Sequence, residues 1–183
     1  MKRLSRLLML LLGLTLLSCG DESPTEPAAA APQFSLASDK LSQLARYRTG
    51  ALQINIGLAL KTIGPQGGRL ALGGFEVIVP PGAVDKGTLF SIRLPIDPYA
   101  SEFVRAQFGP HQSFKAPVTI RLPLRGTTAE NTAAHVLWWN GTDWIPYPTT
   151  VTADGRIETR TWHFSEFGTE DPSRGIILIG GGR

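Results

Sequence analysis

The chain has 183 residues, of which 18 are lysine or arginine and 15 are aspartate or glutamate, giving a net charge of +3. Lys2, Arg3 and Arg6 lie in a segment with the features of a removable leader, and without them the two signs balance. The chain therefore lacks the basic surface expected of a nucleic-acid-binding protein. With 42% apolar residues it can form a core, and a single cysteine excludes a disulfide framework and a cysteine-rich metal site.

Residues 1–18 are expected to form a signal peptide. The basic residues are followed by an apolar run from Leu7 to Leu17 and then by Ser18 and Cys19. This order is typical of a secretory signal. The eleven residues of the apolar run would reach only about 17 Å as a helix, against about 30 Å of membrane hydrocarbon, so a permanent span is not expected.

The segment Leu16-Leu17-Ser18-Cys19 resembles the lipobox of bacterial lipoproteins. The resemblance implies that the Cys19 thiol receives a diacylglyceryl group and that a peptidase then cuts just before Cys19. Two or more acyl chains, such as palmitate, give stable membrane anchoring. Gly20 follows, which by analogy with enterobacterial sorting favours the outer membrane. We expect a protein of the bacterial cell envelope, bound to the membrane through lipid on Cys19, the alternative being a secreted protein with an incidental cysteine.

Residues 19–50 are expected to hold the lipidated cysteine, a linker and a short helix. Gly20–Pro32 contains three prolines and no aromatic or branched apolar residue, which is typical of an extended linker that does not pack. A short amphipathic helix capped by Ser38 is expected next. Its apolar side would be formed by Leu41, Leu44 and Ala45.

From residue 51 to residue 168, side chains alternate with the period of two that is typical of strands with one buried face. Pro95–Phe108 is the least strand-like stretch and is expected to be a helical turn or a crossover loop. Glycine in Asn140-Gly141 and Asp154-Gly155 supplies the positive φ of hairpin turns. Many short strands with almost no helix predict an all-β fold, a single antiparallel β-sandwich. The expected buried rows are Ile54, Ile56, Leu58 and Leu60; Phe75, Val77 and Val79; Phe90, Ile92 and Leu94; and Val118, Ile120, Leu122 and Leu124.

Three segments, Ile63–Leu70, Val77–Val84 and Trp162–Phe167, resemble in their order the ZU-five domain. This β-sandwich module occurs in ankyrins, netrin receptors and zonula occludens proteins, and also on bacterial surface proteins. The resemblance covers roughly residues 60–168, so we expect a ZU-five-like sandwich over 51–168 and a C-terminal tail over 169–183.

The most specific catalytic hypothesis concerns the triplet His163-Phe164-Ser165. Certain death-domain proteins of this family cleave themselves at such a triplet. The resemblance implies that Ser165 Oγ would attack the Phe164 carbonyl carbon, with His163 assisting proton transfer, and that the resulting ester would hydrolyse. Residues 19–164 and 165–183 would then separate. The alternative is a packing role on one strand, in which Phe164 points inward while His163 and Ser165 share the other face, or the reverse.

The four tryptophans, Trp138, Trp139, Trp144 and Trp162, could form an aromatic platform for a sugar or a peptide. The candidate binding residues are Trp138, Trp139 and Trp144. Trp138 and Trp139 are consecutive and therefore face opposite sides of a strand, so one of them could be exposed. The alternative is that these side chains fill the core.

The histidines His111, His135 and His163 are more than twenty residues apart, and the carboxylates are scattered, so no metal site, cofactor or hydrolase triad is expected. We therefore expect a lipid-anchored envelope protein that presents a non-catalytic sandwich for protein interaction or structural support, not an enzyme. Its partner would be an unknown envelope protein or glycan, and not nucleic acid. The alternatives are a self-cleaving domain at Phe164–Ser165 and a carbohydrate-binding module that uses exposed tryptophan.

Overall fold

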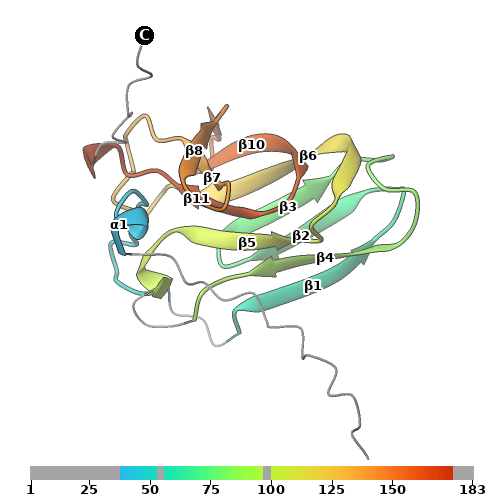
Figure 1. Cartoon of the computed structure of the whole chain (residues 1–183), viewed down its shortest axis with the longest axis horizontal. Coiled ribbons are helices and arrows are strands. Elements are labelled where there is room, and N and C mark those ends of the chain that lie inside the picture. Colours follow the sequence, from blue (N-terminus) through green and yellow to red (C-terminus); the bar gives the residue numbers. More distant parts are fainter. Residues whose placement is uncertain (1–37, 53–55, 97–99, 175–183) are drawn as a thin grey trace, which may run out of the picture. The chain divides into compact units, whose positions relative to one another are not determined.

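The computed structural model describes residues 38–52, 56–96 and 100–174 (Figure 1). The predicted signal peptide, Cys19, residues 20–37 and the tail from residue 175 lie outside the described residues. Within the described part, two antiparallel sheets pack against each other, which confirms the predicted all-β sandwich.

The first sheet has six strands in the order β1-β4-β5-β11-β7-β8. They are β1 Leu58–Ile63, β4 Thr88–Arg93, β5 Arg105–Gly109, β11 Glu166–Thr169, β7 Val136–Trp139 and β8 Trp144–Tyr147. The second sheet has five strands in the order β2-β3-β6-β10-β9. They are β2 Gly68–Leu72, β3 Phe75–Val79, β6 Ser113–Pro123, β10 Arg156–His163 and β9 Thr150–Val151. The short helices are α1 Ser38–Leu41, η1 Ala100–Glu102 and η2 Pro172–Arg174.

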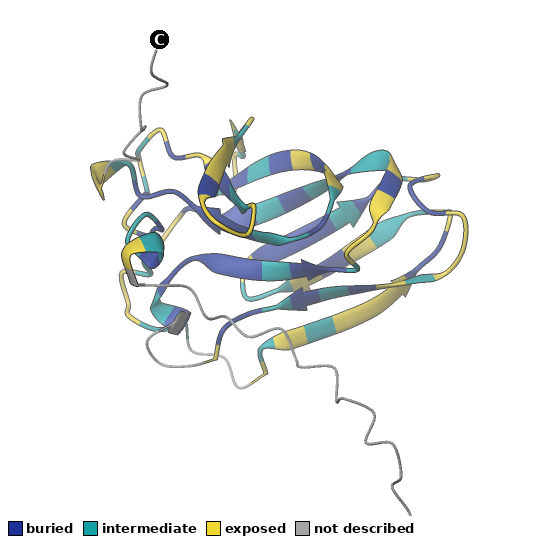
Figure 2. Ribbon diagram, in the orientation of Figure 1, coloured by how far each residue is buried: buried dark blue, intermediate teal, exposed yellow. Residues whose placement is uncertain are grey.

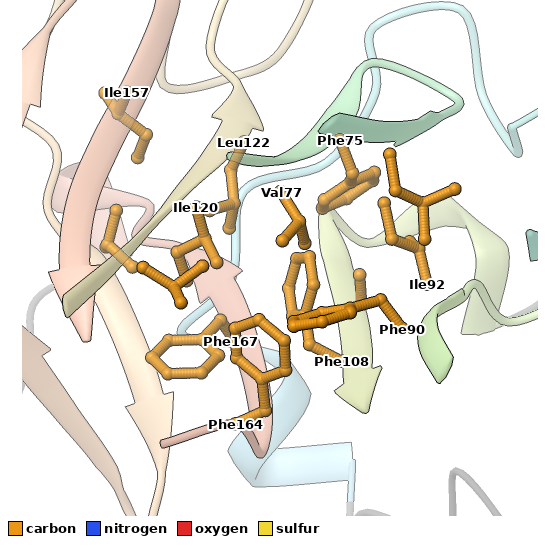
Figure 3. Close-up of a cluster of buried hydrophobic side chains, with 14 of the residues drawn as sticks. Phe75, Val77, Phe90, Ile92, Phe108, Ile120, Leu122, Ile157, Phe164 and Phe167 are labelled. Carbon is orange, nitrogen blue, oxygen red and sulfur yellow. The ribbon is translucent and has the colours of Figure 1, made fainter. Parts of the chain in front are cut away.

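The core lies between the two sheets and is rich in phenylalanine (Figure 3). Three of the four predicted inward rows, those that begin at Phe75, Phe90 and Val118, are buried as expected. The Phe164 ring lies at the centre of an aromatic cluster, with ring centroids 4.7 Å from Phe114, 5.8 Å from Phe108 and 5.9 Å from Phe90. The alternation of apolar and polar residues therefore identified most of the core correctly.

The predicted inward row of β1 is wrong. Leu58 and Leu60 are exposed, whereas Ile63 is buried and Ala59 pairs with the buried Ile92 of β4 (Figure 2). Ile54 lies outside the described residues. Both rows of β1 contain apolar side chains, so alternation alone could not choose between the two faces. The choice depends on which face of this edge strand is covered by another element.

The turns follow the predicted glycine chemistry. Asn140-Gly141 joins β7 to β8, and Asp154-Gly155 joins β9 to β10, so both predicted hairpins are confirmed. Gly67 has a φ of 76°, and a Cβ at this position would come within 2.5 Å of the Val79 carbonyl oxygen. Glycine is therefore required at that turn for both backbone conformation and space. Pro95–Phe108 contains η1 as predicted, but it also contains most of β5, which the sequence pattern did not reveal.

The residues before the sandwich pack onto it. Leu41, Leu44 and Ala45 are buried, as expected for an apolar side, although α1 is only four residues long. The Ala45 N–H donates to the Thr169 carbonyl oxygen at 2.8 Å. Leu41 and Leu44 pack with Phe103, Leu137 and Trp144 on the side of the six-stranded sheet that faces away from the other sheet, which we call its outer face. The folded body thus extends beyond residues 51–168 at both ends.

Candidate functional site

The triplet His163-Phe164-Ser165 forms the crossing from β10 in one sheet to β11 in the other. Phe164 is only 3% exposed and points into the core, which is one of the two orientations that the packing alternative allowed. A strand pairing shift between Thr161 and His163 marks the point where the chain leaves the five-stranded sheet. The local structure therefore gives the triplet a clear packing role at the closure of the sandwich.

The side chains of His163 and Ser165 are engaged with different partners. The Ser165 hydroxyl donates to the Trp139 carbonyl oxygen at 3.1 Å. The His163 ring lies 5.2 Å from the Trp138 ring between centroids, and its Nε2 lies 3.4 Å from the Tyr147 hydroxyl oxygen. No hydrogen bond joins His163 to Ser165 within the described residues. The base and nucleophile of the self-cleavage hypothesis are thus near in sequence but not paired in space.

The three candidate tryptophans do not share one face. Trp138 packs from the inner face against the main core, with Tyr147 at a ring distance of 5.9 Å. Trp139 and Trp144 lie on the outer face of the same sheet, 5.3 Å apart between ring centroids. Trp144 is buried under the N-terminal residues, and its Nε1 donates to the Lys40 carbonyl oxygen at 3.1 Å. These positions confirm that consecutive tryptophans point to opposite sides, and a binding role for the three stays a prediction.

Trp162 is the tryptophan that lies on the surface. It is 57% exposed and belongs to β10, between the buried Thr161 and the partly exposed His163. Sequence reasoning included it among the tryptophans without choosing it. The inner row of β10 contains Thr159 and Thr161 in place of larger apolar residues, so the alternation gave little sign that Trp162 would point outward.

A network of arginines and carboxylates crosses the outer side of the five-stranded sheet, which is the side away from the core. Glu76 of β3 is only 5% exposed, and its carboxylate forms ion pairs with Arg69, Arg121 and Arg156. The Arg156 Nη1 lies 2.9 Å and the Arg121 Nη1 lies 3.3 Å from Glu76 Oε2. Three arginines around one carboxylate hold the side chains of this region in place.

Further carboxylates join the network at its edge. Arg121 Nε donates to Glu158 at 2.7 Å, and this bond is the main reason that the pKa of Arg121 is raised. Arg156 pairs with Asp154, whose carboxyl pKa is lowered to about 2 chiefly by that hydrogen bond. Arg121, Arg156 and Asp154 therefore remain ionised across the physiological range.

A second charged pair is buried on the outer face of the six-stranded sheet. Arg105 of β5 has no exposed side-chain surface, and its Nη1 lies 2.5 Å from Glu166 Oε1 of β11. Burial raises the pKa of the Glu166 carboxyl, and the positive charge of Arg105 opposes part of that rise. Such a pair fixes the register of two neighbouring strands, because either charge left alone would be strongly disfavoured.

The described residues contain no group of three or more histidine, cysteine, aspartate or glutamate side chains with the geometry of a metal site. None of the helices in the described ranges has the length and apolar character needed to span a membrane. Cys19 and its predicted lipidation lie outside these ranges, so they stay predictions.

The chain was also compared with known proteins. Neither the protein-family models nor the curated proteins contain a match to it.

Proposed function

We propose that the protein is a lipid-anchored component of the bacterial cell envelope and that its non-catalytic, ZU-five-like sandwich binds a partner at the surface. The anchor is proposed from the lipobox-like sequence before Cys19. The contact role rests on one observation in the folded body. Trp162 is widely exposed on the sheet that also carries Arg69, Arg121, Arg156 and Arg160.

We call these five residues the tryptophan–arginine face. Tryptophan and arginine are the residue types most enriched among those that dominate protein binding energies. Arg121 and Arg156 are held by carboxylates, so little side-chain freedom would be lost when a partner binds. A rigid surface that presents ordered arginines and one large aromatic side chain suits a partner protein of the envelope.

Trp162→Ala is expected to weaken binding of that partner at least tenfold, because truncating a central tryptophan typically costs more than about 1.4 kcal/mol. Val151→Ala is the matched control, since Val151 is also 57% exposed and lies on the same sheet. Photo-crosslinking in intact envelopes would identify the partner, and titration with the purified partner would give the affinities. Equal affinity of the two variants would contradict the proposal.

Trp162 also favours a second candidate function, the binding of a glycan, because an exposed indole can stack on a sugar ring. Isothermal titration with purified peptidoglycan fragments separates this candidate from protein binding. Glycan binding that is lost in Trp162→Ala and kept in Val151→Ala would support the carbohydrate-binding alternative.

The anchor has its own test. Cys19→Ser is expected to abolish incorporation of radiolabelled palmitate and to release the folded body from membranes that have been washed with high salt, because no acyl chains remain. Membrane fractionation with immunoblotting measures the release. Retention of palmitate by Cys19→Ser would contradict acylation at this cysteine.

A further inference from the structure

Among the described residues, the outer face of the six-stranded sheet is covered at one end only. Residues 41–47 cover the end formed by β11, β7 and β8. At the other end, large aliphatic side chains in and beside β1 and β4 are exposed. Figure 2 shows much of β1 in the colour of exposed residues. We call the exposed set the aliphatic patch; its members are Ile56, Leu58, Leu60, Leu89 and Ile96.

The strand register shows how the patch is built. Leu60 pairs with Ser91 and Thr62 pairs with Leu89, so Leu60 and Leu89 are diagonal neighbours on one face. Leu58 precedes Leu60 by two residues and lies on the same face. Ile56 continues this row, and Ile96 lies beside Gly57, where an added Cβ would be 2.5 Å from Ile96 Cγ2. Several exposed aliphatic side chains grouped at one place mark an interaction surface.

Two cations border the patch. Arg93 pairs with Leu58 in the register and shares its face. Lys86 lies in the loop that leads to β4, next to Asp85, whose carboxylate pairs with Lys115. Lys61 pairs with the inward-facing Phe90, so it lies on the other face of β1, and its Nζ donates to the Arg69 carbonyl oxygen at 2.9 Å. In the part of the chain that the structure describes, no carboxylate forms an ion pair with Arg93 or Lys86. An aliphatic surface bordered by unpaired cations is complementary to the anionic head groups and acyl region of a phospholipid surface. A second copy of the same face would instead bring like charges together.

The chain also enters the folded body on this face. Leu41 and Leu44 pack on the outer face of the six-stranded sheet, so the segment that leads back to Cys19 begins on the same side as the patch. The 18 residues from 20 to 37 span at most about 65 Å when fully extended. This length is an upper limit, so the linker also permits the folded body to lie directly on the membrane that holds the anchor.

From these observations we infer that the aliphatic patch binds the surface of an anionic phospholipid bilayer, with Arg93 and Lys86 contacting lipid phosphates. This inference deepens the proposed function and rests on it, since the anchor brings the patch to the membrane. The two sheets have opposite outer sides, so the tryptophan–arginine face then points away from the bilayer and stays open to a partner.

The test uses the chain from residue 20 onward, which lacks the anchor. Both buried clusters are formed by residues between 41 and 167, so this chain retains the whole described core. It also lacks Cys19, the one native cysteine, so a cysteine introduced by Leu60→Cys or Leu89→Cys is the sole thiol. Each is labelled with the environment-sensitive dye NBD and mixed with vesicles of equal parts phosphatidylglycerol and phosphatidylcholine.

The dye at positions 60 and 89 is expected to brighten several-fold, shift to the blue and be quenched by nitroxide-labelled lipid. The matched control is Thr119→Cys on the outer side of the five-stranded sheet, whose dye is expected to stay in water. Replacing Arg93 and Lys86 together by glutamine is expected to weaken vesicle binding about 30-fold, since each basic residue near an anionic surface contributes about fivefold.

An aqueous signal from positions 60 and 89 in the presence of these vesicles would overturn the inference. So would an equal response at position 119, or a response at position 60 that grows with protein concentration without vesicles, which would indicate a second copy. The anchor is tested separately by Cys19→Ser. A wild-type protein that is not acylated but whose vesicle response is intact would contradict only the proposed anchor. An acylated protein with no vesicle response would contradict only the inferred membrane contact of the patch.

Discussion

Phe164→Ala is expected to lower the free energy of unfolding by about 3–5 kcal/mol, the range typical for removing a buried phenylalanine ring. The ring contacts Phe90, Phe108 and Phe114 at the point where β10 leaves one sheet and β11 joins the other. Its removal would leave a cavity between sheets that the surrounding rings cannot fill without moving. Equilibrium urea denaturation followed by circular dichroism measures the change.

Trp162→Ala is the control, because it removes a larger ring from the same segment but from an exposed position. It is expected to change the free energy of unfolding by no more than about 0.5 kcal/mol. Equal destabilisation by the two variants would show that Phe164 does not close the core.

Arg105→Met is expected to destabilise the protein by about 3–5 kcal/mol at pH 8, because it leaves the buried Glu166 carboxylate without its arginine. The loss should depend on pH. Burial already raises the folded-state pKa of Glu166 above its ordinary value of 4.5, and Arg105 limits that rise. Without Arg105, the pKa of the Glu166 carboxyl in the folded state rises further.

The sign of the pH dependence follows from this higher pKa. The folded variant binds the Glu166 proton more tightly than the unfolded chain, so its stability falls as pH rises from about 4.5 through the folded-state pKa. The difference in the free energy of unfolding between Arg105→Met and the wild type should therefore be smaller at pH 5 than at pH 8. Urea denaturation at both values measures it, with Arg105→Met/Glu166→Gln as the control that lacks the titrating group. An equal gap at both pH values would contradict a buried, titrating Glu166.

The sequence predicted the parts of the fold in which local pattern and global environment agree. The rows that begin at Phe75, Phe90 and Val118 are apolar on one side and mixed on the other, so alternation identified the buried face. The hairpins at Asn140-Gly141 and Asp154-Gly155 were found because glycine can adopt the required positive φ. Both kinds of signal are local, and distant segments do not alter them.

The remaining features depend on long-range packing. Leu58 and Leu60 carry the pattern of a buried row, but β1 is an edge strand whose outer face nothing in the described body covers. β5 was missed because its fully buried Arg105 interrupts the apolar pattern, and the partner of that charge, Glu166, lies 61 residues away.

The candidate site shows the same division. That Phe164 faces away from His163 and Ser165, and that Trp138 and Trp139 lie on opposite faces, follows from strand alternation alone. The exposure of Trp162 does not, because the inner row of β10 alternates with threonine. Neither does the aliphatic patch, because its exposure depends on which part of the sheet the other described elements cover.

Intact-mass spectrometry of the protein extracted from cell membranes tests the account most directly. A single species is expected, with the mass of residues 19–183 plus the diacylglyceryl and further acyl groups on Cys19, and with the Phe164–Ser165 bond unbroken. A species without acyl mass, or a fragment that begins at Ser165 and disappears in Ser165→Ala, would contradict an anchored sandwich that acts by binding.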